Sequence, residues 1–141
     1  MADIKDVNRR FYKEVFDNRN VDAIDELLVE NTIEHEQAPP GVTLKAGREG
    51  VKQLINVYLE AFKPMTVQVQ DQYQDGDTVI TRATFSGTHS GDFAGMPASG
   101  KSFQVEGIDI VRFEGDRMAE HWGQFDVVGM LTQLGAIPPM G

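Results

Sequence analysis

Three histidines are the side chains of this chain best suited to proton transfer near neutral pH: His35, His89 and His121. The ordinary pKa of histidine lies close to physiological pH, so modest changes in its surroundings make it an acid or a base. Their spacing fits no metal-binding motif, because the chain has no His-Glu-x-x-His sequence. The absence of cysteine excludes thiolate metal sites and cysteine nucleophiles. We therefore expect acid–base chemistry without a metal ion.

Asp109 is a carboxylate within an apolar row that includes Val105 and Phe113 at alternate positions. A carboxylate in such a row is costly to bury unless it is paired or hydrogen-bonded. If residues 114–116 form a three-residue hairpin loop, Asp109 lies directly opposite His121, with the Cβ atoms about 5 Å apart. Such a pair suits general acid–base catalysis. A purely structural pair remains open, and a two-residue loop would shift the register and separate the two faces.

The residues that follow His121 have several interpretations. If His121 faces a cavity, Trp122 and Asp126 nominally face away from it, unless a bulge redirects the strand. Gly123 inside a strand suits a bulge or the close approach of a ligand. Asp126 precedes an apolar segment that reads as a helix, so we favour an N-cap over a catalytic role for it.

The elements that must position these residues follow from the hydrophobic pattern. Helical spacing predicts helices over residues 3–17, 20–28 and 48–62. Residues 32–36 form a short extended segment, and alternation predicts long strands over 65–74, 78–89, 102–113 and 117–126. Residues 127–134 close the chain with a helical turn. Short loops between successive strands require antiparallel pairing. The expected class is α+β, with a curved antiparallel sheet packed against three N-terminal helices around a cavity.

Composition excludes several classes of partner. The 141 residues are expected to form one domain, residues 1–141. The formal net charge is −9, and a surface this acidic repels nucleic-acid phosphates. No apolar run approaches the ~20 residues of a membrane span, and the N-terminal residues lack the apolar core of a secretion signal. We expect a cytoplasmic protein that binds neither nucleic acid nor membranes.

The predicted strands over 78–89 and 102–113 carry apolar residues on both faces. Ile80 alternates with Val79, and Ile108 alternates with Val111. Apolar residues on both faces indicate that the outer face of the sheet is also covered. A homodimer that packs sheet on sheet is the simplest cover.

A set of short motifs extends through the second half of the chain. They are the glycine-containing segment 87–97, Ser-Gly-Lys at 99–101, Gly-Ile-Asp-Ile-Val-Arg-Phe at 107–113, Glu-His-Trp at 120–122 and Gln-Leu-Gly at 133–135. In these motifs the chain resembles the SnoaL-like polyketide cyclase family, and the resemblance covers nearly the whole chain. It implies the nuclear-transport-factor-2-like cone, in which a curved antiparallel sheet over helices encloses a deep apolar cavity. It also implies cofactor-free ring closure of an aromatic polyketide ester by aldol condensation, with an acidic residue and a histidine as acid and base.

Some individual positions match the residues of this family, and others differ from them. His89 matches the family's histidine in Gly-x-His-x-Gly, and Asp109 stands where antibiotic cyclases place a cavity histidine. Phe16 and Leu54 match positions that are apolar in some of these cyclases and polar in others. The catalytic aspartate of the cyclases aligns with Gly123, so this chain has no carboxylate there.

The leading hypothesis is cofactor-independent acid–base catalysis, either aldol cyclisation or isomerisation, on a hydrophobic carbonyl compound. Asp109 would be the base and His121 its partner, while His35 and His89 would line the mouth of the cavity or polarise a carbonyl group. No cofactor and no metal are expected. The substrate-binding residues that we expect are Tyr12, Phe16, Leu54, Tyr58, Met96, Trp122, Gly123 and Asp126.

Two other functions stay open. The first is a non-catalytic small-molecule-binding module on the same fold, for which the missing carboxylate at Gly123 would be typical. The second, which we favour less, is an epoxide hydrolase with an Asp-Arg-Asp group around a water molecule. Asp109, Arg112 and Asp126 supply the residue types, but Arg112 lies three residues along a strand from Asp109 and so faces the other side.

Overall fold

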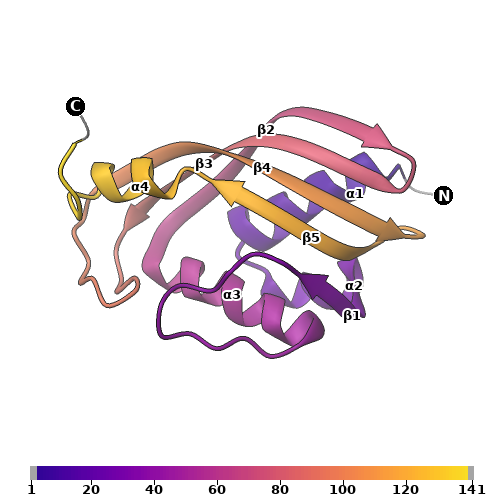
Figure 1. Ribbon diagram of the computed structural model, residues 1–141, viewed down its shortest axis with the longest axis horizontal. Coiled ribbons are helices and arrows are strands. Elements are labelled where there is room, and N and C mark those ends of the chain that lie inside the picture. Colours follow the sequence, from indigo (N-terminus) through magenta and orange to yellow (C-terminus); the bar gives the residue numbers. More distant parts are fainter. Residues whose placement is uncertain (1–2, 140–141) are drawn as a thin grey trace.

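The computed structural model describes residues 3–139 and has the expected α+β class. Helices α1, α2 and α3 lie on one side of a curved sheet, and α4 lies at one end of that sheet (Figure 1). The helices are α1 (Ile4–Phe11), α2 (Ile24–Leu27), α3 (Gly47–Ala61) and α4 (Val127–Gln133). The strands are β1 (Leu28–Glu34), β2 (Phe62–Asp75), β3 (Thr78–His89), β4 (Ser102–Glu114) and β5 (Arg117–Phe125).

The first helical segment is not one uniform helix. It begins after its N-cap, Asp3, whose side chain accepts a hydrogen bond from the backbone N–H of Lys5 at 2.9 Å. After α1 the chain continues as a π-helical segment, Tyr12–Asp17, which buries both Tyr12 and Phe16. Short π-helical segments frequently occur at functional sites. Among residues 3–139, no helix combines the length and apolar character that crossing a membrane requires.

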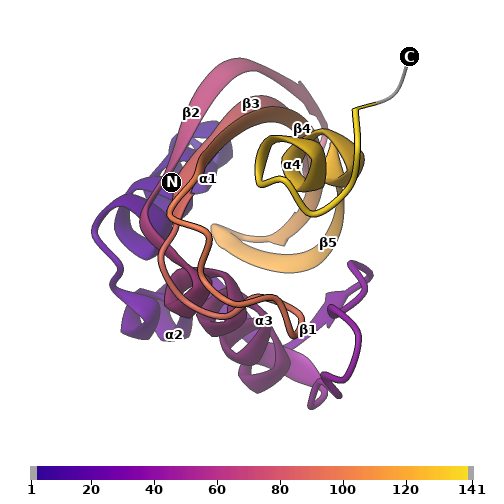
Figure 2. The ribbon, with the colours of Figure 1, turned by 90° about the vertical axis from the view of Figure 1, so that its left-hand side faces the viewer.

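The five strands are ordered β1-β5-β4-β3-β2 in one sheet. The pairs from β2 to β5 are antiparallel, as predicted. The extended segment predicted over 32–36 begins earlier, as β1, and pairs with β5 in parallel, so the sheet is mixed. Figure 2 shows that the sheet curls into an open arc, with α4 near one end.

The turn between β4 and β5 differs from the predicted three-residue loop. Glu114 pairs with Arg117, so only two residues, Gly115 and Asp116, form the turn. Ala119 is then an extra residue, because Phe113 pairs with Met118 while Arg112 pairs with Glu120. This β-bulge moves the register by one further residue and places His121 and Asp109 on the same face again.

The core lies between the inner face of the sheet and the helices. Inward-facing strand residues pack against the apolar faces of the π-helical segment, α2 and α3. Each fully buried large apolar side chain contributes roughly 1.5–3 kcal/mol to stability. Among the most deeply buried side chains are Val15, Ile24, Leu54, Phe62, Val79, Val111 and Phe113.

Helix α4 begins at the predicted cap. The Asp126 side chain accepts a hydrogen bond from the backbone N–H of Gly129 at 2.8 Å. A Cβ atom at Gly129 would lie 2.2 Å from Asp126 Oδ2, so glycine is required for this close approach. The helix in turn buries Met130 against the core.

We predict that Asp126→Ala lowers the free energy of unfolding by about 1 kcal/mol, because it removes the cap of α4. Urea denaturation measures the loss. Asp126→Asn is the matched control, since asparagine caps helices as well as aspartate does, and it should keep wild-type stability. Equal losses in both variants would contradict the capping role.

Candidate active site

A largely apolar cavity opens between the inner face of the sheet and the helices. Its wall receives side chains from α1, the π-helical segment, α3, α4 and every strand. The aromatic and aliphatic side chains that shape it include Phe16, Leu54, Tyr58, Phe85, Phe103 and Phe125. Concave apolar sites with a few convergent polar groups are typical of small-molecule binding.

Asp109 and His121 meet in this cavity, and the predicted contact between them is confirmed. His121 Nε2 lies 2.8 Å from Asp109 Oδ1. The predicted register is wrong, because Asp109 is directly opposite Gly123 and His121 is opposite Val111. The two-residue turn and the bulge at Ala119 each shift the register by one residue, so the shared face is preserved and the contact is diagonal.

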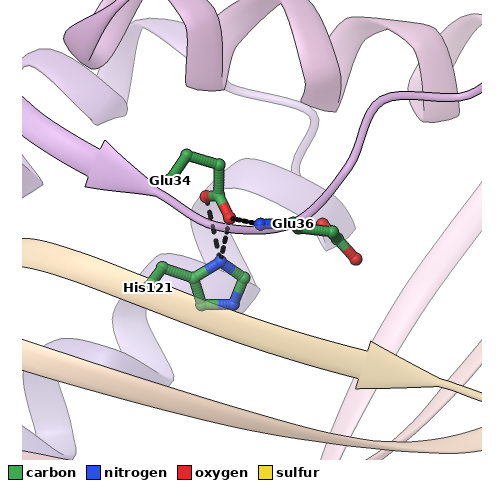
Figure 3. A group of neighbouring side chains, drawn as sticks. All are labelled: Glu34, Glu36 and His121. Atoms are coloured by element: carbon green, nitrogen blue, oxygen red, sulfur yellow. Dashed lines mark hydrogen bonds and ion pairs between the residues drawn. The ribbon is translucent and has the colours of Figure 1, made fainter.

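Two further side chains extend this pair into a chain of hydrogen bonds. Glu34 approaches the other ring nitrogen of His121, with its two carboxylate oxygens 2.7 and 2.9 Å from Nδ1 (Figure 3). On the far side, the hydroxyl group of Tyr12 donates to Asp109 Oδ2 at 2.5 Å. The array therefore runs Glu34–His121–Asp109–Tyr12, and three strands and the π-helical segment supply its members.

The array favours the protonated form of His121. Burial lowers its pKa, but the hydrogen bonds to Asp109 and Glu34 and their negative charges outweigh burial and raise the pKa well above its ordinary value. Both ring N–H groups then donate to carboxylates. Burial, together with the charge and hydrogen bond of Asp109, raises the pKa of Tyr12 well above its ordinary value, so Tyr12 is a neutral donor.

Glu36 is a third carboxylate of this site. It lines the cavity just beyond β1, and burial raises its pKa to about 7. One ligand atom from each of Glu34, Glu36 and His121 lies within 4.8 Å of the others, a separation that a metal ion can bridge. Both nitrogens of His121, however, already contact carboxylates, and its raised pKa disfavours the deprotonated ring that a metal requires.

Four of the expected substrate-binding residues line the cavity. Tyr12 and Phe16 come from the π-helical segment, and Leu54 and Tyr58 come from α3. Tyr12 has two roles in the cavity, because it lines the wall and its hydroxyl group also belongs to the hydrogen-bonded array.

His35 and Trp122 lie outside the cavity, contrary to expectation. The His35 ring stacks on Trp122, with 4.8 Å between ring centroids, and its Nε2 atom lies 2.8 Å from Glu120 Oε2. Because side chains alternate along a strand, the inward direction of Glu34 and His121 sends His35 and Trp122 to the outer face.

His89 and Met96 are also displaced from the cavity wall. His89 is 1% exposed, and its Nδ1 atom accepts a hydrogen bond from the backbone N–H of Ser99 at 3.2 Å. Its ring packs against Phe62, so it anchors the loop before β4. Met96 pairs with Phe93 within that loop and packs against the edge of the core.

Gly123 and Asp126 were also expected to bind substrate, and neither lines the cavity. Gly123 lies directly opposite Asp109 on the same face of the sheet, and Asp126 is the exposed cap of α4. The Asp-Arg-Asp group of an epoxide hydrolase is not assembled, because Arg112 faces outward to Glu120, with Arg112 Nε 3.0 Å from Glu120 Oε1.

Sequence reasoning missed Glu34 and Glu36, the carboxylates on either side of His35. The signal was present, because strict alternation places these two residues on one face and His35 on the other. The pairing of this segment with β5 could not be predicted, since the partner strand lies more than 80 residues further along the chain.

Comparison with known proteins agrees with this architecture. TsrD from Streptomyces laurentii superposes with a TM-score of 0.84 at 27% identity, covering 97% of this chain and all of that one. IdmH from Streptomyces antibioticus, a proposed polyketide cyclase, superposes with a TM-score of 0.81 at 31% identity, covering 95% of this chain and 99% of that one.

A curated relative is aklanonic acid methyl ester cyclase DnrD from Streptomyces peucetius, which is 32% identical over 62 residues. That alignment covers 44% of this chain and 43% of DnrD, less than half the length of either protein. The sequence model of the SnoaL-like polyketide cyclases matches residues 6–134. With a family match over almost the whole chain and a fold shared with IdmH, this protein belongs to the SnoaL-like polyketide cyclase family.

Proposed function

We propose that this protein catalyses cofactor-independent proton transfer beside the carbonyl group of a hydrophobic substrate, leading to aldol ring closure or isomerisation. The observation that carries the proposal is the Glu34–His121–Asp109–Tyr12 array within an apolar cavity. Proton abstraction beside a carbonyl produces an enolate, and its negative charge needs a fixed positive group close by.

His121 supplies that positive group in the proposed mechanism. Its imidazolium ring is held on both sides, so it requires no reorientation when charge develops on the substrate. Asp109 was expected to act as the base. Both of its oxygens accept hydrogen bonds, from Tyr12 and from His121, and this favours a positioning role in which Asp109 keeps His121 charged and oriented.

The apolar wall supports the choice of a hydrophobic substrate. Aromatic rings from the π-helical segment, α3 and β5, namely Phe16, Tyr58 and Phe125, would enclose carbon rings and exclude water. Exclusion of water strengthens the interaction between His121 and a developing enolate. DnrD is named for its action on aklanonic acid methyl ester, which makes this ester the first substrate to assay.

A non-catalytic binding module is the second candidate. It is favoured by one observation, the glycine at position 123 where the resemblance places the acid of the cyclases. A hydrophobic ligand that co-purifies with the protein, without any turnover, would support this alternative over catalysis.

We also propose that the outer face of the sheet forms a homodimer. Ile108 and Trp122 expose 49% and 39% of their surface on this face, and Ile110 lies directly opposite Trp122. Contiguous exposed apolar side chains of this kind typically mark an interaction surface.

Asp109→Asn should lower turnover of an accepted carbonyl substrate by about 10²–10⁴-fold, because a neutral amide cannot keep His121 charged. Turnover of aklanonic acid methyl ester is the measurement, with circular dichroism to verify folding. Asp71→Asn is the matched control, since Asp71 pairs with Arg82 on the outer face and should leave turnover unchanged. Wild-type turnover in Asp109→Asn would reject the assignment.

The raised pKa of His121 gives a prediction of pH dependence. Nitrogen-15 NMR should find both ring nitrogens protonated at pH 7.5, and Glu34→Gln should lower the pKa. Since folding raises this pKa above the unfolded value of about 6.5, the stabilisation is complete below pH 6.5 and is lost as the pH rises through the folded pKa. A neutral ring at pH 7.5 would contradict the proposed role of His121.

Light scattering coupled to size-exclusion chromatography should find a dimer at micromolar concentration. Trp122→Ser should shift the protein towards the monomer, because it removes the largest apolar side chain of the outer face. Val128→Ser, at an exposed position on α4 and outside this face of the sheet, is the control and should stay dimeric. A monomeric wild-type protein would overturn the dimer.

A further inference from the structure

We propose that Glu36 is the catalytic base of this site, which removes the proton beside the substrate carbonyl and later returns it to the product. This assignment rests on the proposed function and deepens it. The polar array holds the positive charge at His121 but leaves no free base among its own members, whereas Glu36 stands beside the array with an unengaged carboxylate.

The backbone of Glu36 is fixed to the array while its side chain is not. Its N–H group donates to Glu34 Oε1 at 2.9 Å, immediately beside the contact between Glu34 and His121. Figure 3 shows the side chain of Glu36 extending away from the Glu34 carboxylate. The side chain lines the same cavity as Asp109 and His121, so a bound substrate can reach all three.

The three neighbouring carboxylates differ in what they contact. Both oxygens of Asp109 accept hydrogen bonds, and both oxygens of Glu34 lie within 2.9 Å of His121 Nδ1. Among residues 3–139, the Glu36 carboxylate has neither a hydrogen-bond donor nor an ion-pair partner. Hydrogen bonds stabilise the charged form of a carboxylate and weaken it as a base. Glu36 is therefore the carboxylate that is available for proton transfer.

Its surroundings also suit the protonation state that a base requires. Burial raises the pKa of Glu36 to about 7, with Asp109 and Glu34 adding to the rise and the charge of His121 opposing it. General bases work best when their pKa lies close to the working pH. The negative charge of Glu36 also contributes, after burial, to the raised pKa of Tyr58, which faces the same cavity.

Position 123 cannot hold the base in this chain. A Cβ atom at Gly123 would lie 2.7 Å from Asp109 Oδ1 and 2.8 Å from His121 Cε1. A side chain at this position would therefore meet the ends of the Asp109 and His121 side chains, and their contact would have to shift. A site built on that pair needs its base on another wall, and Glu36 approaches from the segment that follows β1.

The proposed step balances without a cofactor. The Glu36 carboxylate takes the proton, and the electrons of the C–H bond form the carbon–carbon double bond of an enolate whose oxygen faces the charge of His121. In an aldol closure the enolate carbon then bonds to a second carbonyl carbon of the same substrate. The alkoxide that results takes the proton back from the Glu36 carboxyl group, so no electron or proton is lost.

The test compares Glu36→Gln with Glu30→Gln, an exposed glutamate on the preceding strand β1, and with Glu36→Asp as a conservative variant. Aklanonic acid methyl ester is incubated with each protein, and both turnover and exchange of its acidic C–H protons in D₂O are followed by NMR. We expect Glu36→Gln to lower kcat and exchange by about 10²–10⁴-fold with KM little changed, and to remove the acidic limb of the pH profile near pH 7. Glu36→Asp should restore part of the rate and that limb, and Glu30→Gln should match the wild type.

The outcomes separate the two proposals. Wild-type kcat and exchange in Glu36→Gln, with the loss retained in Asp109→Asn, would overturn the role of Glu36 and leave the proposed function standing. Absence of turnover and exchange in the wild-type protein would overturn both. Stoichiometric divalent metal in the purified protein, or loss of its activity in EDTA, would also overturn the role of Glu36, because it would make this carboxylate a metal ligand with Glu34 and His121.

Discussion

The site depends on one partly buried set of charges, the His121 ring between the carboxylates of Asp109 and Glu34. Removing such charges from water costs several kcal/mol for each ion, and only close, well-oriented contacts offset that cost. Asp109 comes from β4, His121 from β5 and Glu34 from β1, so three strands must keep their relative register to within one residue. The bulge at Ala119 is therefore a requirement of the site, because without it His121 would face solvent.

The same contacts explain why a third carboxylate can lie beside the first two. Asp109 and Glu34 carry two negative charges against the single positive charge of His121, so the site has a net negative charge. An ionised Glu36 makes that net charge more negative. Its protonation near neutral pH removes the added charge, which agrees with the direction of its pKa. Tyr12 reduces the cost further by donating to the oxygen of Asp109 that His121 does not contact. This balance of charges is consistent with the proposed role of Glu36 as a base.

The sequence predicted the α+β class, the four long strands and the contact between Asp109 and His121. That contact was reached with an incorrect register, because a shorter turn and an unpredicted bulge compensated for each other. Bulges depend on how a strand packs after it has paired, so periodicity alone does not locate them. Glu34 and Glu36 were missed for a related reason. Their segment was read as a short isolated piece, and the parallel partner that directs it is set by tertiary packing.

The parallel pairing of β1 with β5 connects stability to chemistry. β1 is an edge strand with an irregular register, and such edges are the least constrained part of a sheet. At its end, the backbone N–H of His35 donates to the carbonyl oxygen of His121 at 3.0 Å, and the side chain of Glu34 contacts the ring of the same residue. His121 therefore holds the edge strand in place through its backbone and its side chain together. Because Glu36 follows soon after β1, any loosening of this edge would move both the proposed base and the His121 charge that is proposed to stabilise an enolate.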